Sequence, residues 1–312
     1  MTALTVRARA CAKVNWVLEV LNRRPDGYHE VRTVIQTIDV CDALELQPAA
    51  ELCLEAPDEG LPSPAENLAM KAARLLQERA AGLGRVSADL SAPGARIRLS
   101  KAVPVAAGLG GGSSDATAVL RGLNELWQLG LEQEALADVA ARLGSDVPFF
   151  LRGGTALAGG RGERITPLPD APPQELLIAV PRLTLADKTR RMYSLLTPAD
   201  YTDGSAAERL TDATRQGRPL EADARWDEHL FNVFDGPAFR TFPELERLRR
   251  ALLEAGARSV HLAGSGPALF TLAGDAAQRG RLTRAAVQAG ARAFVAATAP
   301  AAEAVALEVV TG

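Results

Sequence analysis

Residues 104–115 read PVAAGLGGGSSD, and this combination of residue types suits the binding of a phosphate group. Glycines allow backbone N–H groups to approach an anion closely, and the first turn of a following helix adds partial positive charge. The stretch lacks the lysine that completes a Walker A loop, and Ser113 and Asp115 stand where a dinucleotide-binding fingerprint requires glycine. A flexible linker is the alternative, although a linker seldom lies between a strand and a well-patterned helix. We therefore predict a phosphate loop of a different kind.

Two charged residues have the chemistry needed for acid–base catalysis. Asp146 follows an apolar helical pattern and precedes Val-Pro-Phe-Phe, so it can point into a partly apolar cleft. Lys13 lies between apolar neighbours in AKVNW, where a charge is costly unless it is paired; an ammonium beside Asp146 would keep that carboxylate ionised. Only four basic residues are lysines, so a lysine in such a place counts slightly towards function. Two alternatives stay open, a turn aspartate that caps the next segment and a strand lysine that faces water.

The 312-residue chain has the composition of an ordinary globular protein, with 47% hydrophobic residues, 23% charged residues and a net charge of -3. This balance lacks the basic excess of a nucleic-acid-binding protein, so we expect no nucleic acid as partner. Basic residues interrupt the N-terminal segment and no stretch is long and apolar enough to cross a membrane, so we expect a cytoplasmic protein without membrane contact.

The three cysteines, Cys11, Cys41 and Cys53, lack CxxC spacing and are interpreted as small core residues.

The expected elements fall into two halves that meet near residue 165. Residues 5–54 show β-rich segments around a turn at Pro25-Asp26-Gly27, which predicts a hairpin-like return. The patterns predict these further elements of the first half: helix 66–81, strand 96–100, helix 113–130 and helix 133–143. The second half is predicted as strand 175–180, helix 245–256, strands 259–265 and 268–274, helix 281–290 and strand 291–298. The conformation of the polar stretch at 196–223 is left open. The last run predicts an antiparallel sheet with helices on one face.

Three segments resemble the motifs of the GHMP kinases, the family of galactokinase, homoserine kinase and mevalonate kinase. PVAAGLGGGSSDA is similar to their second motif, and AKVNWVLEV near the N-terminus and HLAGSGPALF near the C-terminus are similar to the other two, in the same order. The resemblance implies an α+β fold of two domains, an N-terminal ribosomal-protein-S5-like nucleotide domain over residues 1–165 and a C-terminal ferredoxin-like α/β sandwich over residues 166–312. It also implies ATP and Mg2+ as cofactors, with both substrates in the cleft between the domains.

The turn DGYHE at residues 26–30 and the segment GSDVPFFLRGGTALAGGRGE are similar to one branch of this family. That resemblance implies a small-molecule substrate that carries a cytidine diphosphate group. The implied reaction transfers the γ-phosphoryl group of ATP to the 2-hydroxyl of 4-diphosphocytidyl-2-C-methylerythritol, a step of the non-mevalonate route to isoprenoids. Two alternatives stay open, another small-molecule kinase of the family such as homoserine kinase, and a nucleotide-binding regulator without turnover. We expect a monomer or a weak homodimer.

The resemblance also assigns the catalytic and nucleotide-binding residues. It makes Asp146 the base and Lys13 its electrostatic partner, with Asn15 as a substrate contact or as the residue that orients this pair. The residues expected to surround ATP are Asn67, Lys101, Pro104, Val105, Ala106, Ala107, Gly108, Leu109, Gly110, Gly111, Gly112, Ser113, Ser114, Gly264, Ser265 and Gly266. For Asn67 helix capping is an equal explanation, and Lys101 either flanks the nucleotide or extends its charge to solvent.

At the other end of the substrate, the resemblance implies that Tyr28 stacks on the cytosine ring and that His29 bonds its polar edge. The opposing ring in relatives comes from an S-T-x-x-x-Y segment. LTLADKTRRMYSLL offers Thr184 and Tyr193 in that place, although this segment departs from the pattern.

Four positions depart from the usual motifs. Ala106 and Ala107 replace common glycines, and Asp115 stands where asparagine is frequent and adds negative charge near the phosphates. Trp16 is bulkier than the usual residue, so we expect it to reshape the substrate pocket. No protein ligand for Mg2+ is evident in the sequence, and Ser114 is a candidate contact.

Overall fold

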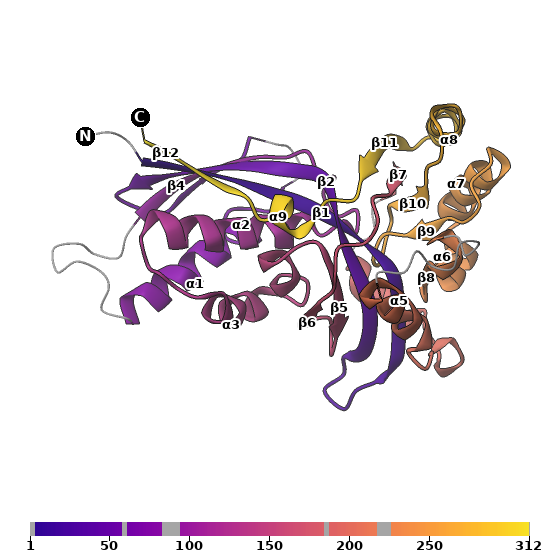
Figure 1. Cartoon of the computed structure of the whole chain (residues 1–312), viewed down its shortest axis with the longest axis horizontal. Helices are drawn as coiled ribbons and strands as arrows, with labels where there is room; N and C mark the ends of the chain where they lie inside the picture. Colours follow the sequence, from indigo (N-terminus) through magenta and orange to yellow (C-terminus); the bar gives the residue numbers. More distant parts are fainter. Residues whose placement is uncertain (1–3, 58–60, 83–93, 184–186, 217–225, 312) are drawn as a thin grey trace.

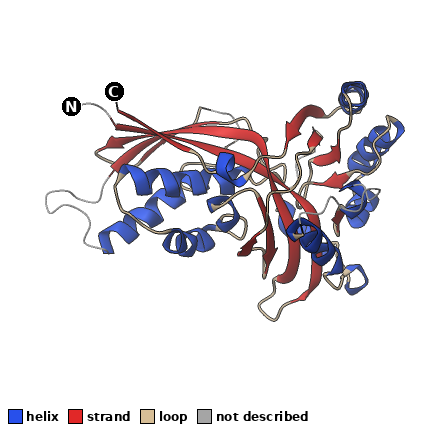
Figure 2. Cartoon of the chain, in the orientation of Figure 1, coloured by secondary structure: helices blue, strands red, loops and turns tan. Residues whose placement is uncertain are grey.

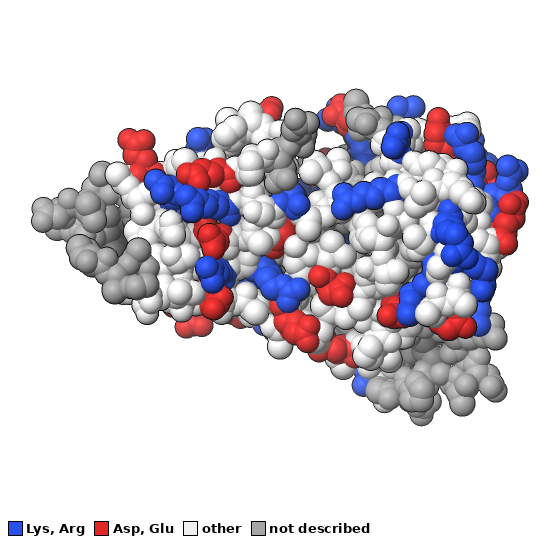
Figure 3. All heavy atoms as spheres, turned by 90° about the horizontal axis from the view of Figure 1, so that it is seen from above, with Lys and Arg blue, Asp and Glu red and all other residues white. Residues whose placement is uncertain are grey.

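The structure, a computed structural model, describes residues 4–57, 61–82, 94–183, 187–216 and 226–311. It consists of two sheets side by side, each with helices packed against it, so the fold is α+β as predicted (Figure 1, Figure 2). Acidic and basic side chains are mixed on the face seen from above (Figure 3). Among the helices of the described ranges, none is long and apolar enough to cross a membrane.

A long antiparallel hairpin of β1 (Leu4–Arg23) and β2 (His29–Ala49) forms the centre of the first sheet and confirms the predicted return at Pro25-Asp26-Gly27. The sheet order is β12-β1-β2-β4-β3, while β5 also pairs with β2, β6 with β5, and β8 with β1. The other strands of this sheet are β3 (Cys53–Glu55), β4 (Gly94–Ser100), β5 (Thr155–Gly159), β6 (Arg164–Pro167), β8 (Phe231–Asn232) and β12 (Leu307–Thr311).

Two register shifts in the pairing of β1 with β2 lie on either side of the segment that contains Lys13 and Asn15. The register shifts between Cys11 and Lys13 and again between Asn15 and Val17. Bulges of this kind re-aim side chains and are frequent beside active sites. Every residue of β1 from Cys11 to Val20 is buried, so the alternative of a lysine that faces water is wrong.

Helices α1 (Leu68–Gly82), α2 (Gly111–Leu126) and α3 (Gln133–Leu143) lie together along one side of the first sheet (Figure 1). Small and apolar residues of α1 and α2 pack on Leu44 and Leu46 of β2, which gives this half a core of its own. The predicted helix 133–143 is confirmed, whereas α2 ends at Leu126, before the predicted Gly130. A single 3-10 turn, η1 (Pro148–Leu151), follows α3.

The second sheet has the order β11-β7-β10-β9 and is antiparallel throughout. Its strands are β7 (Glu175–Val180), β9 (His261–Leu262), β10 (Leu269–Leu272) and β11 (Arg292–Ala297), and α7 (Pro243–Glu254) and α8 (Ala276–Gln288) cover its outer side (Figure 1). This arrangement confirms the predicted α-β-β-α-β run. The strand predicted at 259–265 is shorter than expected because the chain turns at Gly264 and Gly266, both at positive φ.

The remaining elements are α4 (Lys188–Ser194), η2 (Pro198–Asp200), α5 (Ser205–Arg215), η3 (Trp226–His229), α6 (Asp235–Thr241) and α9 (Ala301–Ala304). Helix α5 lies in the polar stretch 196–223, whose conformation the sequence left open. The last strand, β12, pairs with β1, so the end of the chain lies in the first sheet. The division of the chain into residues 1–165 and 166–312 stays a prediction.

The cysteines do not behave as expected. Cys11 and Cys41 stand directly opposite each other in the β1–β2 ladder and form a disulfide, and Cys53 is exposed on β3. The interpretation as a core residue holds for Cys11, which is buried, but is wrong for the half-buried Cys41 and the exposed Cys53. The disulfide was not expected, because strand register and not sequence spacing brings Cys11 and Cys41 together.

Candidate active site

Two adjoining cavities lie beside the middle of β1. The larger, of ≈ 970 Å³, is lined by the β1–β2 turn, the β5–β6 turn and α4, and the smaller, of ≈ 370 Å³, by the glycine stretch and the start of α1. Five residues line both cavities: Lys13, Ser113, Asp146, Thr189 and Ser265. A molecule in one cavity therefore meets a molecule in the other at these side chains.

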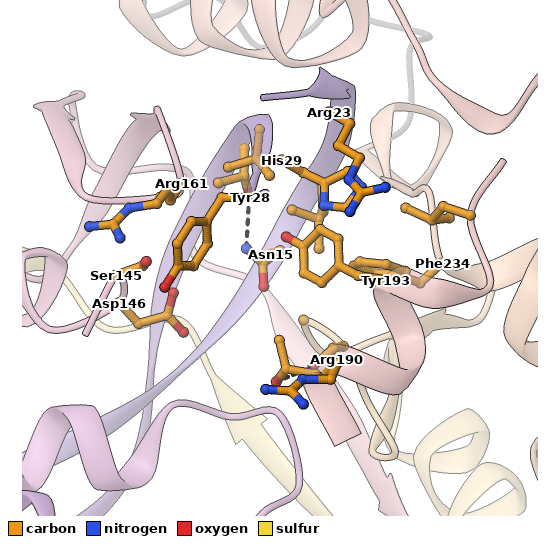
Figure 4. Close-up of a pocket in the computed structure, with 18 of the residues that line it drawn as sticks. Asn15, Arg23, Tyr28, His29, Ser145, Asp146, Arg161, Arg190, Tyr193 and Phe234 are labelled. Atoms are coloured by element: carbon orange, nitrogen blue, oxygen red, sulfur yellow. Dashed lines mark hydrogen bonds between the residues drawn. The ribbon is translucent and has the colours of Figure 1, made fainter. Parts of the chain in front are cut away.

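Lys13 and Asp146 are brought together at this junction. The Lys13 Nζ lies 3.6 Å from the Asp146 Oδ2; the lysine side chain is 5% exposed and the carboxylate 42%. The same ammonium donates to the Asn15 Oδ1 at 2.8 Å. The Asn15 Nδ2 donates to the Thr33 Oγ1 at 2.8 Å, the bond drawn as a dashed line at Asn15 in Figure 4. The Thr33 hydroxyl in turn donates to the Val17 carbonyl at 2.6 Å. This chain of hydrogen bonds holds Lys13 in place and leaves the carboxylate open to a ligand.

The loop that carries Asp146 is tied to α2. The single Thr117 hydroxyl proton is shared between the Val147 carbonyl, at 2.9 Å from Oγ1, and the Ser113 carbonyl, at 3.0 Å, so one side chain contacts both the Asp146 loop and the start of the helix. Val147 and Phe149 are fully buried on the far side of the loop. Asp146 therefore projects from a rigid turn into the cavity junction.

The glycine stretch needs bare backbone partly because it packs against the chain itself. A Cβ at Gly108 would lie 2.1 Å from the Ala263 carbonyl oxygen, and one at Gly110 would lie 2.7 Å from the Phe150 ring; both residues have positive φ, 91° and 76°. The residues of this stretch that line the smaller cavity are Pro104, Val105, Ala106, Ala107, Gly108, Leu109, Gly110, Gly111, Gly112 and Ser113. The stretch thus forms a bare backbone wall that continues into the N-terminus of α2, where the first N–H groups have no helical partner.

Lys101 lies beneath this wall between two aspartates. Its ammonium donates to the Asp115 Oδ2 at 2.7 Å and also to Asp42, and all three side chains are buried. Asp42 additionally accepts the N–H groups of Ala102 and Val103 at 2.6 and 2.8 Å. Burial raises the pKa of Asp115 to about 7. Lys101 therefore does not extend its charge to solvent, and Asp115 faces a lysine as well as the smaller cavity.

Asn67 and Ser114 differ in their access to the smaller cavity. The Asn67 Oδ1 accepts the Ala69 N–H at 2.9 Å and so caps α1, as one of the two interpretations expected. The residue also lines the smaller cavity, and its contact with a nucleotide stays a prediction. Ser114 is 3% exposed and lines neither cavity, whereas Ser113 lines both. The serine open to a ligand, or to a bound metal, is thus Ser113 and not Ser114.

The turn Gly264-Ser265-Gly266 comes from the second sheet and closes the junction. A Cβ at Gly264 would lie 3.0 Å from the Lys13 Nζ, so this glycine allows the turn to approach the lysine. The Asn232 Nδ2 donates to the Gly264 carbonyl at 2.8 Å and fixes the turn. Gly266 lines neither cavity, but its carbonyl accepts a hydrogen bond from Lys188.

The predicted aromatic residues line the larger cavity from two sides (Figure 4). Tyr28 is 54% exposed on the β1–β2 turn, with the Arg161 guanidinium 4.7 Å from its ring centroid. The His29 ring stacks on Tyr193 with centroids 4.8 Å apart. Burial lowers the pKa of His29, with a further contribution from Arg23, so the imidazole is neutral at pH 7. The cavity therefore offers the exposed ring of Tyr28 and the half-buried ring of Tyr193 to a flat ligand.

Several lining residues escape the sequence interpretation. Thr184 lies outside the described residues, and Thr189 lines both cavities with its Oγ1 3.4 Å from the Ser265 Oγ. Thr189 precedes Tyr193 by the spacing of the S-T-x-x-x-Y pattern, a signal that identifies it from the sequence. Lining residues without such a signal are Arg23, Ser145, Arg161, Lys188, Arg190, Tyr201 and Phe234.

Trp16 does not shape the substrate cavity. Its side chain is fully buried against Trp226 and Phe270 and lines neither cavity, so the expectation of a direct effect on the pocket is wrong. It belongs to a core that also contains Leu109 and Ala263, and thus it supports the glycine stretch and the C-terminal turn from behind.

Comparisons with known proteins agree on one family. Residues 67–154 match the family model of the GHMP kinases N terminal domain, and residues 208–292 match that of the GHMP kinases C terminal domain. A 4-diphosphocytidyl-2-C-methyl-D-erythritol kinase of Dehalococcoides mccartyi is 42% identical over 267 residues, which are 85% of this chain and 88% of that protein. One of Symbiobacterium thermophilum is 43% identical over 279 residues, 87% of this chain and 92% of that protein.

Solved structures extend the comparison to the fold. A crystal structure of 4-(cytidine 5'-diphospho)-2C-methyl-D-erythritol kinase matches with a TM-score of 0.75 and 37% identity, covering 94% of this chain and 98% of that one. A homoserine kinase from Cytophaga hutchinsonii matches with a TM-score of 0.70 but only 17% identity, covering 99% of this chain and 98% of that one. The second likeness concerns the fold alone.

Proposed function

The chain belongs to the GHMP kinase family, and from that premise we propose that it transfers the γ-phosphoryl group of ATP to the 2-hydroxyl of 4-diphosphocytidyl-2-C-methyl-D-erythritol. The products are ADP and the 2-phosphate, within the non-mevalonate route to isoprenoid precursors. The observation that carries the proposal is the junction of the two cavities at Lys13 and Asp146, because phosphoryl transfer requires two ligands to meet at one point. The relatives that are about 40% identical over most of the chain specify the substrate.

In the proposed reaction, Asp146 accepts the proton of the substrate 2-hydroxyl as that oxygen attacks the γ-phosphorus of ATP. A new oxygen–phosphorus bond forms, the bond between the γ-phosphorus and the β,γ-bridging oxygen breaks, and ADP leaves. The Lys13 ammonium, 3.6 Å from the carboxylate, supplies positive charge beside the attacking oxygen. Asn15 orients this lysine.

The smaller cavity fits a nucleotide triphosphate. Its wall of backbone from Pro104 to Ser113 and the N-terminus of α2 suit the phosphates, and Asn67 lies where the cavity continues towards α1. Mg2+ would neutralise phosphate charge. Among the described residues no cluster of three or more His, Cys, Asp or Glu side chains is placed to hold a metal, so phosphate oxygens and water would supply most ligands, with the Ser113 hydroxyl nearby.

The larger cavity fits a ligand with a flat polar base and a diphosphate. We propose that cytosine stacks between Tyr28 and Tyr193 and that neutral His29 bonds its polar edge. Arg23, Arg161 and Arg190 line the same cavity and provide positive charge for the diphosphate.

A substrate panel tests the proposed function. ADP release by the purified protein with Mg-ATP would be measured in parallel with 4-diphosphocytidyl-2-C-methylerythritol, homoserine, mevalonate and galactose. We expect turnover with the first compound alone. Turnover with another alcohol would replace the proposed substrate, and nucleotide binding without ADP release from any compound would favour a regulator. The cytoplasmic location and the monomeric or weakly dimeric state stay predictions.

A further inference from the structure

Lys188 connects the two glycine turns that border the smaller cavity. Its Nζ donates to the Gly266 carbonyl at 2.5 Å and to the Ala106 carbonyl at 3.2 Å. Ala106 belongs to the glycine stretch and Gly266 to the turn from the second sheet, so the ammonium lies where these two segments meet. Lys188 lines the cavity together with Lys13 and Asp146.

The ammonium keeps one donor for a ligand. An ammonium has three N–H donors, and the two carbonyls take two of them. Within the ranges that the structure describes, no carboxylate forms an ion pair with Lys188. The third donor is therefore available to a molecule in the cavity.

The charge of Lys188 is costly at the place where it lies. The pKa of Lys188 is lowered to about 8, mainly by burial and also by the positive charge of Lys13, while Asp146 partly opposes both effects. Asp187, its neighbour in the chain, is exposed to solvent. A cation held at such a cost beside a second lysine suits a ligand that brings several negative charges.

We infer that Lys188 is a second catalytic lysine, which donates to the phosphate groups of ATP and neutralises the charge that develops on the transferred phosphoryl group. This inference rests on the proposed function. Lys13 contacts Asn15 and Asp146, on the side of the attacking hydroxyl. Lys188 contacts the glycine stretch, on the side of the nucleotide. The competing explanation is a structural clamp that joins the two turns without contacting the nucleotide.

Lys188→Met tests the charge, with Lys71→Met as the matched control. Lys71 is an exposed lysine of α1 that lines neither cavity. Removal of one charged group that stabilises a transition state typically costs 10²–10³ in rate, so we expect kcat/KM for ATP to fall about 100-fold or more in Lys188→Met. Lys71→Met should match the wild type. An unchanged kcat/KM in Lys188→Met would overturn the inference.

The pH profile separates a catalytic cation from a clamp. For the wild type, kcat/KM for ATP reports the free enzyme, so it should fall above about pH 8 as Lys188 loses its proton. Bound phosphates raise the pKa of the ammonium, so the corresponding alkaline decrease in kcat, the alkaline limb of the profile, should lie at higher pH. The residual activity of Lys188→Met should lack this alkaline limb. A limb that persists unchanged in Lys188→Met, together with a lowered Tm, would establish the clamp instead.

A binding measurement keeps this test independent of the proposed substrate. Calorimetry with Mg-ADP at pH 7 and pH 9 should show weaker nucleotide binding at pH 9 for the wild type and for Lys71→Met, but not for Lys188→Met. Equal pH dependence in all three proteins would overturn the inference, whatever alcohol the enzyme phosphorylates. If the wild type binds nucleotide as expected but leaves 4-diphosphocytidyl-2-C-methylerythritol unmodified, the proposed function fails and the role of Lys188 at the phosphates stands.

Discussion

The Asn15 Oδ1 accepts a hydrogen bond of 2.8 Å from the Lys13 Nζ, and this contact fixes the ammonium within reach of Asp146. Both residues lie on β1 between two shifts of its register, where the strand is buried on every side. The bulges and the asparagine together explain how a charged lysine is kept inside a sheet and pointed at a single carboxylate.

Asp146→Asn should lower kcat by about 10²–10⁴-fold, because the amide cannot accept the hydroxyl proton. The affinity for Mg-ATP should stay within a few-fold of the wild type, since the phosphate wall comes from other residues. Steady-state turnover and nucleotide calorimetry on the same preparations would measure both quantities. A rate close to that of the wild type would remove Asp146 from the role of base.

Tyr28→Ala should raise the KM for the cytidylylated substrate about tenfold or more, since stacking of a base on an aromatic ring contributes about 1–3 kcal/mol. Tyr28 is exposed on a turn, so the free energy of unfolding should hardly change. Tyr28→Phe keeps the ring and serves as the matched control. The KM for ATP should not move in either variant, and an unchanged KM for the cytidylylated substrate in Tyr28→Ala would argue against stacking.

Gly108→Ala should destabilise the protein and weaken nucleotide binding. The new Cβ would lie 2.1 Å from the Ala263 carbonyl oxygen at a φ of 91°, so the glycine stretch and the C-terminal turn would have to separate. Strain of this kind costs about 1–3 kcal/mol. Gly280→Ala, inside α8, is the control: its Cβ meets only the tip of Arg284, and the change should stabilise the helix by about 0.5–1 kcal/mol. Urea unfolding would measure both, and equal stability of the two variants would contradict the packing argument.

Asp115→Asn should change how stability depends on pH. Burial raises the folded pKa of Asp115 from 3.8 to about 7, so the folded protein holds a proton that the unfolded chain has released between these values. This group therefore makes the wild type less stable as pH rises from about 4 to about 7, and the variant lacks that loss. Urea unfolding at pH 5 and pH 8 should show that the advantage of Asp115→Asn over the wild type grows with pH. The exposed Asp138→Asn should show no such growth, and a constant difference for Asp115→Asn would refute the raised pKa.

Local sequence patterns were sufficient to predict the elements whose apolar residues are regularly spaced or form one continuous run. The helix at residues 133–143 matches the structure because its apolar residues repeat at helical spacing, and the strand at 175–180 matches because it is a short continuous apolar run. Helix α5 buries only a narrow stripe in a polar sequence, and β12 has no buried residue of its own, so neither produced a comparable signal. Their positions depend on β1, with which β12 pairs and whose Glu19 accepts the Ala207 N–H of α5.

The residues of the candidate site also fall into those that the sequence predicts and those that depend on the tertiary fold. The glycine stretch and Asp146 stand out in the sequence because their residue types are unusual for a packed core. The contacts of Lys188 could not be predicted, because its two carbonyl partners lie on separate turns that only the tertiary fold brings together. The disulfide between Cys11 and Cys41 depends on strand register in the same manner.

Phosphorus-31 NMR of the complete reaction tests the central claim most directly. The wild-type protein would be incubated with Mg-ATP and 4-diphosphocytidyl-2-C-methylerythritol, with the Asp146→Asn variant as the matched control. We predict one new phosphomonoester resonance in the wild-type sample, ADP in equal amount, and intact diphosphate resonances of the cytidylylated compound. Release of inorganic phosphate without a new phosphomonoester, or cleavage of the diphosphate, would contradict phosphoryl transfer to the substrate hydroxyl at the junction of the two cavities.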